Sequence, residues 1–309
     1  MKWIKKGHIF ETNKQAEWMF SHAQCPTPLV MEDRIRIYFA AKSESLRGLP
    51  TFIDVEKDNP QKIIQVNKTP LLEMGKIGTF DEDGVTPSFV MKKNNKIYLY
   101  YGGWSRGLSV HYRNSTGVAI SNDNGLTFKK YSAGPILTLN EFDHLSATAP
   151  WILQKDGKYI AIYSTGIDWI EINGHLEHTY LLTSAFSDDG IHWTPTGKNL
   201  IEPENDFMAY CKPTIIELDG TYHLWYSKRG SHNFRKPGDT AYRIGYAYST
   251  DLENWTKDDA NAGIDVSAEG WDSEMICYSY IVKVGNKYLM FYNGNGFSKT
   301  GFGYAELEM

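Results

Sequence analysis

The stretch that decides the fold is Pro150-Trp-Ile-Leu-Gln-Lys-Asp-Gly-Lys-Tyr-Ile-Ala-Ile-Tyr163. Two apolar runs flank Asp156-Gly157, and this pattern is a strong signal of a β-hairpin. The same plan recurs in four other stretches, namely 28–39, 87–101, 213–226 and 279–292. The residues that close the five stretches are aromatic and lie 62, 62, 63 and 66 residues apart: Phe39, Tyr101, Tyr163, Tyr226 and Tyr292. This regularity indicates one structural unit used five times.

Further strands follow each hairpin. Third strands are expected at 117–121, 181–187, 244–249 and 301–307, and fourth strands are expected to end near Leu72, Leu137, Ile201 and Val266. Four antiparallel strands per unit, in five units, predict an all-β, five-bladed β-propeller. The fifth unit supplies only three strands, so we expect residues 3–10 to be the N-terminal strand that closes the last blade. No linker interrupts the pattern, which predicts a single domain over residues 1–309.

Composition excludes several classes of protein. The 309 residues carry a net charge of -5, which argues against a nucleic-acid partner. No apolar run is long enough for a membrane span. Three cysteines without a C-x-x-C motif predict neither a disulfide framework nor structural zinc. The N-terminus has no apolar signal segment, so a cytoplasmic location is expected.

Long segments after the closing aromatics point to a ligand site. The first strand of a hairpin starts on the face where the second strand ends, so segments 102–114, 164–178 and 227–240 should converge on one mouth. They are rich in cations and aromatics, which predicts an anionic carbohydrate or a sugar phosphate as ligand. We expect no cofactor or metal, and the oligomeric state is left open. The candidate substrate-binding residues are Trp104, Arg106, His111, Arg113, Asp143, His144, Trp169, Lys212, Lys228, Arg229, His232, Arg235 and Tyr278.

The five units, with Ser-x-Asp-Gly-type turns before an aromatic residue, resemble the five-bladed propeller glycosidases of families 32, 43, 62, 68, 117 and 130. Segments 78–84 and 270–274 are most similar to members related to families 43 and 130. The resemblance implies hydrolysis, or phosphorolysis in family 130, by carboxylates at the axial mouth. It also implies an Asp directly before the first-blade proline. The residues directly before the four prolines are Thr27, Thr86, Ala149 and Lys212, so the usual catalytic triad is missing.

Other carboxylates lie close to the same places. Glu82 and Glu274 both lie five residues before the proline-equivalent position of their units, and Asp83 lies one residue nearer to the strand. A general acid paired with a base or nucleophile is what glycoside hydrolysis requires. The sequence therefore predicts Glu274, with Glu82 or Asp83, as catalytic residues. The alternative is that these side chains cap loop amides.

Two repeated features receive a structural interpretation. Asp81, Asp143 and Asp272 each follow an aromatic residue, as expected for loop braces. His22 and His144 share the offset of Asp81, and a metal at the axis is the less favoured alternative. Cys25, Cys211 and Cys277 precede inner strands, as small buried residues near an axis would.

Two functions fit these observations. The first is a glycoside hydrolase-like enzyme that acts on an anionic sugar or glycoconjugate. The alternative is a propeller that binds or transfers a sugar in surface-polysaccharide biosynthesis, or a glycoside phosphorylase.

Overall fold

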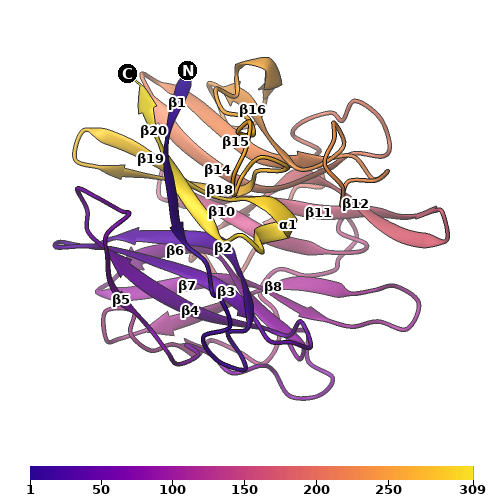
Figure 1. Ribbon diagram of the computed structural model, residues 1–309. Helices are drawn as coiled ribbons and strands as arrows, with labels where there is room; N and C mark the ends of the chain where they lie inside the picture. The colour runs from indigo at the N-terminus through magenta and orange to yellow at the C-terminus, as the bar shows by residue number, and fades with distance from the viewer. Residues whose placement is uncertain (309) are drawn as a thin grey trace.

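Strands form almost all of the regular structure in residues 1–308, the part of the chain that the computed structural model describes (Figure 1). They fall into successive groups along the chain. The first group contains β2 (Ser21–Val30), β3 (Ile35–Lys42), β4 (Gly48–Val55) and β5 (Ile63–Val66). The second contains β6 (Gly84–Lys93), β7 (Lys96–Ser105), β8 (Arg113–Ser121) and β9 (Lys129–Lys130). The third contains β10 (Ala147–Lys155), β11 (Lys158–Ile172), β12 (His175–Ser187) and β13 (Thr194–Pro195).

The fourth group contains β14 (Ala209–Leu218), β15 (Thr221–Arg229), β16 (Arg243–Ser249) and β17 (Thr256–Lys257). The last contains β18 (Cys277–Val284), β19 (Lys287–Asn293) and β20 (Phe302–Glu308), with β1 (Lys2–Phe10) beside β20. Two short helical turns, η1 (Asp259–Asn261) and α1 (Asn295–Ser298), interrupt the strands. No helix in residues 1–308 is both long and apolar enough to cross a membrane.

Each group is an antiparallel meander, and its first strand faces the first strands of the neighbouring groups. β2 contacts β6, β6 contacts β10, β10 contacts β14, β14 contacts β18, and β18 contacts β2 again. Figure 1 shows β2, β6, β10, β14 and β18 near the middle of the molecule. The first strands therefore meet in the interior, and the later strands of each group lie outside them.

The two ends of the chain share one sheet, in the order β1-β20-β19-β18. β1 pairs with β20 from Lys2 opposite Glu308 to Phe10 opposite Phe302. Figure 1 shows both termini at the same edge of the molecule. Residues 3–10 thus occupy the fourth-strand position that the sequence predicts for them.

Two sequence expectations need correction. The long loop expected over 164–178 is a hairpin, because β11 and β12 extend to a two-residue turn at Asn173-Gly174, where both residues have positive φ. Asn-Gly is the preferred turn for such a hairpin. The fourth strands are also shorter than predicted. In the second group β9 ends at Lys130, and pairing resumes only in the isolated bridge between Thr116 and Leu137, after Gly134 and Pro135. Proline cannot donate to the ladder in between.

Turns on the third strands hold neighbouring groups together. In the second group the hydroxyl of Ser121 bonds to the Asp123 carboxylate, which also accepts the N–H groups of Leu126 and Thr127. The same Ser-x-Asp arrangement recurs at Ser187 and Ser249. The hydroxyl of Tyr38, from the first group, donates to the carbonyl of Gly125 in this turn. A Cβ at Gly125 would lie 2.1 Å from that hydroxyl, so the contact requires glycine.

A buried hydrogen bond between tyrosine and aspartate is repeated in three groups. The hydroxyls of Tyr101, Tyr163 and Tyr292 donate to carboxylates twenty residues earlier, at 3.2, 2.7 and 2.9 Å; the acceptors are Asp81, Asp143 and Asp272. Each bond ties the segment before a first strand to the second strand of the same hairpin. In the first group Phe39 takes the place of the tyrosine, and the buried Met19 takes the place of the aspartate twenty residues earlier. The structure therefore places the three aspartates as the loop braces that the sequence favours.

The brace can be tested in the third group. Tyr163→Phe should lower the free energy of unfolding by about 1–3 kcal/mol, because the buried Asp143 loses a hydrogen bond and keeps its desolvation cost. Denaturant unfolding measures this change. Tyr159→Phe is the matched control, since that buried tyrosine makes no hydroxyl hydrogen bond within residues 1–308. Equal losses in the two variants would contradict the bracing role.

The sheet that joins the termini predicts the effect of a truncation. Deletion of residues 1–10 should abolish soluble folded protein, because it removes β1 and exposes the edge of β20 to solvent. The measurement is the yield of soluble protein and its thermal unfolding. A truncated chain that unfolds cooperatively at the melting temperature of the parent would refute the expectation.

Candidate functional site

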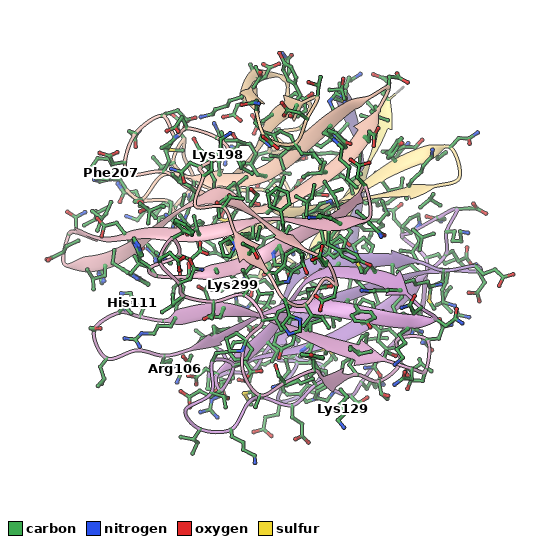
Figure 2. The ribbon with its side chains drawn as sticks, turned by 180° about the vertical axis from the view of Figure 1, so that it is seen from behind. Arg106, His111, Lys129, Lys198, Phe207 and Lys299 are labelled. Carbon is green, nitrogen blue, oxygen red and sulfur yellow. The ribbon has the colours of Figure 1, made fainter. Side chains whose placement is uncertain are left out.

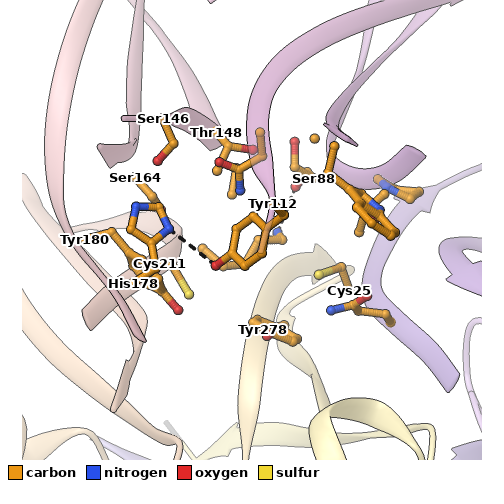
Figure 3. Close-up of a pocket in the computed structure, with 18 of the residues that line it drawn as sticks. Cys25, Ser88, Tyr112, Ser146, Thr148, Ser164, His178, Tyr180, Cys211 and Tyr278 are labelled. Atoms are coloured by element: carbon orange, nitrogen blue, oxygen red, sulfur yellow. Dashed lines mark hydrogen bonds between the residues drawn. The ribbon is translucent and has the colours of Figure 1, made fainter. Parts of the chain in front are cut away.

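A cavity of about 400 Å³ opens where the first strands meet (Figure 3). All five first strands line it near their N-terminal ends, together with the ends of second strands and the segments that follow them. The lining residues on or next to first strands are Gln24, Cys25, Thr86, Pro87, Ser88, Ser146, Thr148, Ala149, Cys211, Lys212 and Tyr278. The others are Lys42, Leu46, Gly102, Trp104, Tyr112, Asn114, Ser164, His178, Tyr180 and Tyr242.

Unusual backbone conformations direct several first-strand residues into the cavity. Cys25, Ala149, Lys212 and Tyr278 all have φ between 52° and 57°, in the left-handed region. Each lies at a break in the pairing of its strand, as in a β-bulge, and such breaks change the direction of a side chain. A non-glycine residue in this region costs about 1–3 kcal/mol and persists where the surrounding structure enforces it, often at functional sites. The bulges mark this cavity as the candidate site.

Two lysines line the cavity without a carboxylate partner. No Asp or Glu belongs to the lining, and neither Lys42 nor Lys212 forms an ion pair within residues 1–308. The Lys212 ammonium donates to the carbonyl of Ser88 at 2.8 Å and lies 4.8 Å from the ring centre of Tyr280. Burial lowers the pKa of Lys212 to about 8, and it also lowers the pKa of Lys42. The positive charge of this cavity is therefore held without an acidic counterion.

Arg229 adds a third buried cation behind the wall. Its guanidinium donates to the carbonyl of His178 at 2.7 Å and lies 3.8 Å from the ring centre of Phe234. Arg229 likewise has no carboxylate within 4.0 Å among residues 1–308. Arg229 thus contacts two residues that line the cavity, His178 and Tyr180.

His178 is held rigidly at the cavity wall. Its ring stacks on Trp169 at 4.5 Å, and its Nδ1 lies 3.3 Å from the hydroxyl of Tyr112, a contact that Figure 3 shows. Burial, with a smaller effect from the charge of Arg229, lowers the pKa of His178 to about 3. The imidazole is therefore neutral at physiological pH.

Burial favours the protonated form of the two thiols in the lining. Burial raises the pKa of Cys25 to about 12 and that of Cys211 to about 11. Both remain protonated at neutral pH, and the thiolate is the reactive form. They serve as small buried side chains, as their positions in the sequence favour.

Three of the predicted substrate-binding residues line the cavity: Trp104, Lys212 and Tyr278. Two others, Trp169 and Arg229, contact His178 from outside the cavity.

The other predicted substrate-binding residues lie away from the lining. Lys228 pairs with Asp259 and Glu204, Arg235 with Glu177, and His232 packs on Phe207. The imidazole of His144 bonds to the carbonyl of Glu141, and the carboxylate of Asp143 accepts the hydroxyl hydrogen bond of Tyr163. Arg106 donates to the carbonyl of Ser45, His111 lies beside Trp169, and Arg113 is exposed. Figure 2 shows Arg106 and His111 toward the outer edge of the molecule.

The three predicted catalytic carboxylates lie outside the lining. Glu82 accepts the N–H of Gly78 at 2.7 Å, and Glu274 is exposed. Asp83 is buried and accepts the N–H of Arg106 at 2.9 Å. Its own N–H donates to the carbonyl of Trp104, so Asp83 is the one of the three that bonds to a lining residue. Their catalytic roles stay predictions.

Sequence reasoning missed Lys42 and did not select His178, Asn114 or the lining serines. A signal for Lys42 exists in the repeat, because it lies three residues after Phe39, as Trp104 follows Tyr101 and Arg229 follows Tyr226. Alignment of the five units by their closing aromatics would have identified it. Nothing comparable marks Asn114 or Ser146, which are ordinary polar residues in the sequence.

Comparisons with known proteins give relatives and a fold. The chain matches no described family profile. It is 34% identical over 310 residues to the "Uncharacterized protein Rv1502" of Mycobacterium tuberculosis strain H37Rv, with all of both chains covered. It is equally similar to the "Uncharacterized protein MT1551" of strain CDC 1551.

Solved structures of glycoside hydrolases have the same fold. A putative glycoside hydrolase from Bacteroides ovatus aligns with a TM-score of 0.76 at 16% identity, over 100% of this chain and 97% of that one. A thermostable family-43 glycoside hydrolase aligns at 0.69 and 21% identity, over 94% and 91%. A structure from the family 130 of mannoside phosphorylases and hydrolases aligns at 0.75 and 14% identity, over 99% and 93%. The chain thus shares its fold with these glycoside hydrolase structures.

The unpaired lysine predicts an unusual dependence of stability on pH. Because the folded state lowers the pKa of Lys212 to about 8, against 10.5 in the unfolded chain, the unfolded chain binds more protons between these values. The parent protein therefore pays an ionisation penalty at pH 7 that is relieved as pH rises through this window. Lys212→Met, which removes the buried charge, should raise the melting temperature at pH 7 by about 2–4 °C, and the gain should shrink toward pH 10.

Thermal unfolding of both proteins at pH 7 and pH 9.5 tests this expectation. Lys287→Met, at an exposed ion pair with Glu306, controls for the loss of one positive charge. A Lys212→Met protein that melts below the parent at both pH values would show that the Ser88 and Tyr280 contacts outweigh the burial penalty.

Proposed function

The chain belongs to the same family as the two Mycobacterium tuberculosis proteins, and we propose that it is a closed five-bladed β-propeller that binds an anionic sugar or sugar phosphate in its central cavity. The cyclic contacts of β2, β6, β10, β14 and β18 support five blades around one axis. The pairing of β1 with β20 supports closure of the last blade by the N-terminal strand. A single domain over residues 1–309 and a cytoplasmic location belong to the same proposal; three free, buried cysteines fit a reducing compartment.

The observation that carries the proposal is the carboxylate-free lining around Lys42 and Lys212. A buried ammonium without a counterion costs several kcal/mol in effective desolvation, so a protein keeps one where something else compensates it. An anionic ligand group, such as a phosphate or a carboxylate, would supply that compensation through charge-assisted hydrogen bonds. The buried Arg229 strengthens the positive potential in the same region.

The rest of the lining suits a sugar. Trp104, Tyr112 and Tyr278 offer aromatic surface, and Ser88, Thr148 and Ser164 offer hydroxyl groups. Aromatic surface combined with a few placed polar groups is typical of sites for small polar ligands. The cavity volume of about 400 Å³ is sufficient for one or two sugar rings.

Binding or transfer of the sugar fits this lining better than hydrolysis does. Glycoside hydrolysis uses two carboxylates beside the anomeric carbon, and no carboxylate lines the cavity. One observation keeps hydrolysis or phosphorolysis as the second candidate: Asp83 is buried, and its backbone N–H donates to the carbonyl of Trp104, which lines the cavity. In that case Asp83, with Glu274 or Glu82, would supply the acid and the base.

The proposal predicts a charge-dependent binding profile. Isothermal titration with glucose 1-phosphate, glucuronate and glucose should show preference for the charged sugars. Lys42→Met and Lys212→Met should each weaken a charged sugar about tenfold or more, since one charge-assisted hydrogen bond contributes about 1.5–3 kcal/mol. Affinity in the parent should fall as pH rises above about 8, where Lys212 loses its proton.

Two controls make the result specific. Lys129→Met removes an exposed cation from β9, outside the cavity lining, and should leave binding unchanged. Asp83→Asn and Glu274→Gln should also bind charged sugars as the parent does. Turnover of an unactivated alkyl glycoside that the parent shows and either carboxylate variant loses would instead establish the hydrolytic candidate, because such a leaving group must be protonated. Equal affinity for charged and neutral sugars would refute the anion site.

A further inference from the structure

We propose that one wall of the cavity, formed by Asn114, Ser146, Ser164 and His178, is a hydrogen-bonding subsite for uncharged hydroxyl groups of a sugar ring. We call these four residues the polar wall. The inference rests on the proposed function, because it assigns the neutral part of the ligand to this wall and the anionic group to Lys42 and Lys212. It therefore fixes how the ligand lies in the cavity.

Unsatisfied polar atoms in the polar wall point to a ligand. The Oδ1 of Asn114, the Oγ of Ser164 and the Nε2 of His178 are buried and have no hydrogen-bond partner within residues 1–308. Ser164 is 2% exposed and His178 is 3% exposed. A buried polar atom without a partner costs about 1–3 kcal/mol, and native proteins contain few of them. Three such atoms in one cavity wall indicate hydrogen bonds that a ligand completes.

The orientation of His178 is fixed by contacts that leave Nε2 free. Trp169 stacks on the ring at an interplanar angle of 6°, Tyr112 contacts Nδ1, and Arg229 holds the backbone carbonyl. With both its ring plane and its Nδ1 occupied, the imidazole has only Nε2 to offer. Figure 3 shows His178, Ser146 and Ser164 on the same side of the cavity.

A glycine brings two groups of the polar wall together. The Nε2 of His178 and the Oγ of Ser146 both lie within 2.6 Å of the point where a Cβ of Gly166 would stand. Any side chain at 166 would occupy the space between them. Gly166 pairs with Tyr180 in the β11–β12 hairpin, so strand pairing fixes the position of this glycine beside His178 and Ser146.

The chemistry of the polar wall selects hydroxyl groups over ions. Asn114 Oδ1 accepts hydrogen bonds, a serine hydroxyl both donates and accepts, and a neutral imidazole Nε2 does one or the other according to its tautomer. A sugar hydroxyl also donates and accepts, so it can pair with each of them. The wall carries no formal charge, because His178 is neutral at physiological pH. Its partner is therefore a polyhydroxylated ring rather than a second anionic group.

The test separates the two halves of the ligand. A panel of glucose, galactose, mannose and N-acetylglucosamine 1-phosphates is titrated into the parent protein, and the tightest is compared with inorganic phosphate. His178→Phe keeps an aromatic ring against Trp169 and removes Nε2, so it should weaken the sugar phosphate about tenfold and leave inorganic phosphate unchanged. Lys212→Met should weaken both. His223→Phe is the matched control, since His223 stacks on Tyr246 at 12° outside the cavity lining.

Two further variants keep the test decisive if His178→Phe does not fold. Ser164→Ala removes an unpartnered hydroxyl, so it should melt at or above the parent temperature while weakening the sugar phosphate. Gly166→Ala keeps every polar group but places a methyl 2.5 Å from Nε2 and 2.6 Å from the Ser146 hydroxyl, so these groups must shift. If the variant folds, it should weaken the sugar phosphate and spare inorganic phosphate.

The possible outcomes are distinct. If no sugar phosphate binds more tightly than inorganic phosphate, or if the wall variants weaken both ligands equally, the polar wall is not a sugar subsite. If the parent binds neither phosphate nor any sugar phosphate, the proposed function itself fails, and the wall inference fails with it.

Discussion

The buried hydrogen bond from a tyrosine hydroxyl to an aspartate twenty residues earlier is the contact on which the geometry of the site depends. In three of the groups it joins the segment that enters a first strand to the second strand. Those two chain segments are also the ones that line the cavity. Ser146 and Ser164, for example, lie three residues after Asp143 and one residue after Tyr163. The brace thus holds the two sides of these three hairpins at a fixed separation beside the cavity, where β-bulges direct individual side chains inward.

The cavity differs in charge from what a resemblance to glycosidases implies. Lys212 stands directly before Pro213, a kind of position where that resemblance places a carboxylate. Lys212 has a left-handed backbone conformation and lines the cavity, and its side chain is a cation and not a carboxylate. Around Lys212 the lining carries a second lysine and several hydroxyl groups and, within residues 1–308, no Asp or Glu. This difference is the basis on which we propose binding of an anionic sugar ahead of its hydrolysis.

The sequence predicts the order of the strands much more completely than it predicts the residues of the candidate site. A repeat of some sixty residues with hairpin turns at Asp156-Gly157 and Asp219-Gly220 determines strand order, and β10, β11, β14 and β15 follow it closely. Site residues depend instead on side-chain direction at single positions. Lys228 and Arg229 are neighbours in the sequence, yet one pairs with Asp259 and the other lies behind His178. Successive side chains of β15 point to opposite faces of the sheet, so the two cations lie on different sides. A count of charged residues in a segment does not show this difference. The prediction of an anionic ligand survives as a proposal, with Lys42 and Lys212 in place of most of the loop arginines.

The pairing of β1 with β20 has a consequence for how this chain acquires its structure. β1 precedes every other strand, and β20 follows every other strand, so the first strand to be synthesised waits for the last before its hydrogen bonds can form. Until then β1 and β19 are open edges, able to pair with another chain. Contacts of such large sequence separation also form slowly, because closing a long loop costs entropy before any contact repays it. The nascent chain is therefore most exposed to aggregation in the interval before β20 forms, because only β20 completes the sheet that joins β1 to β19.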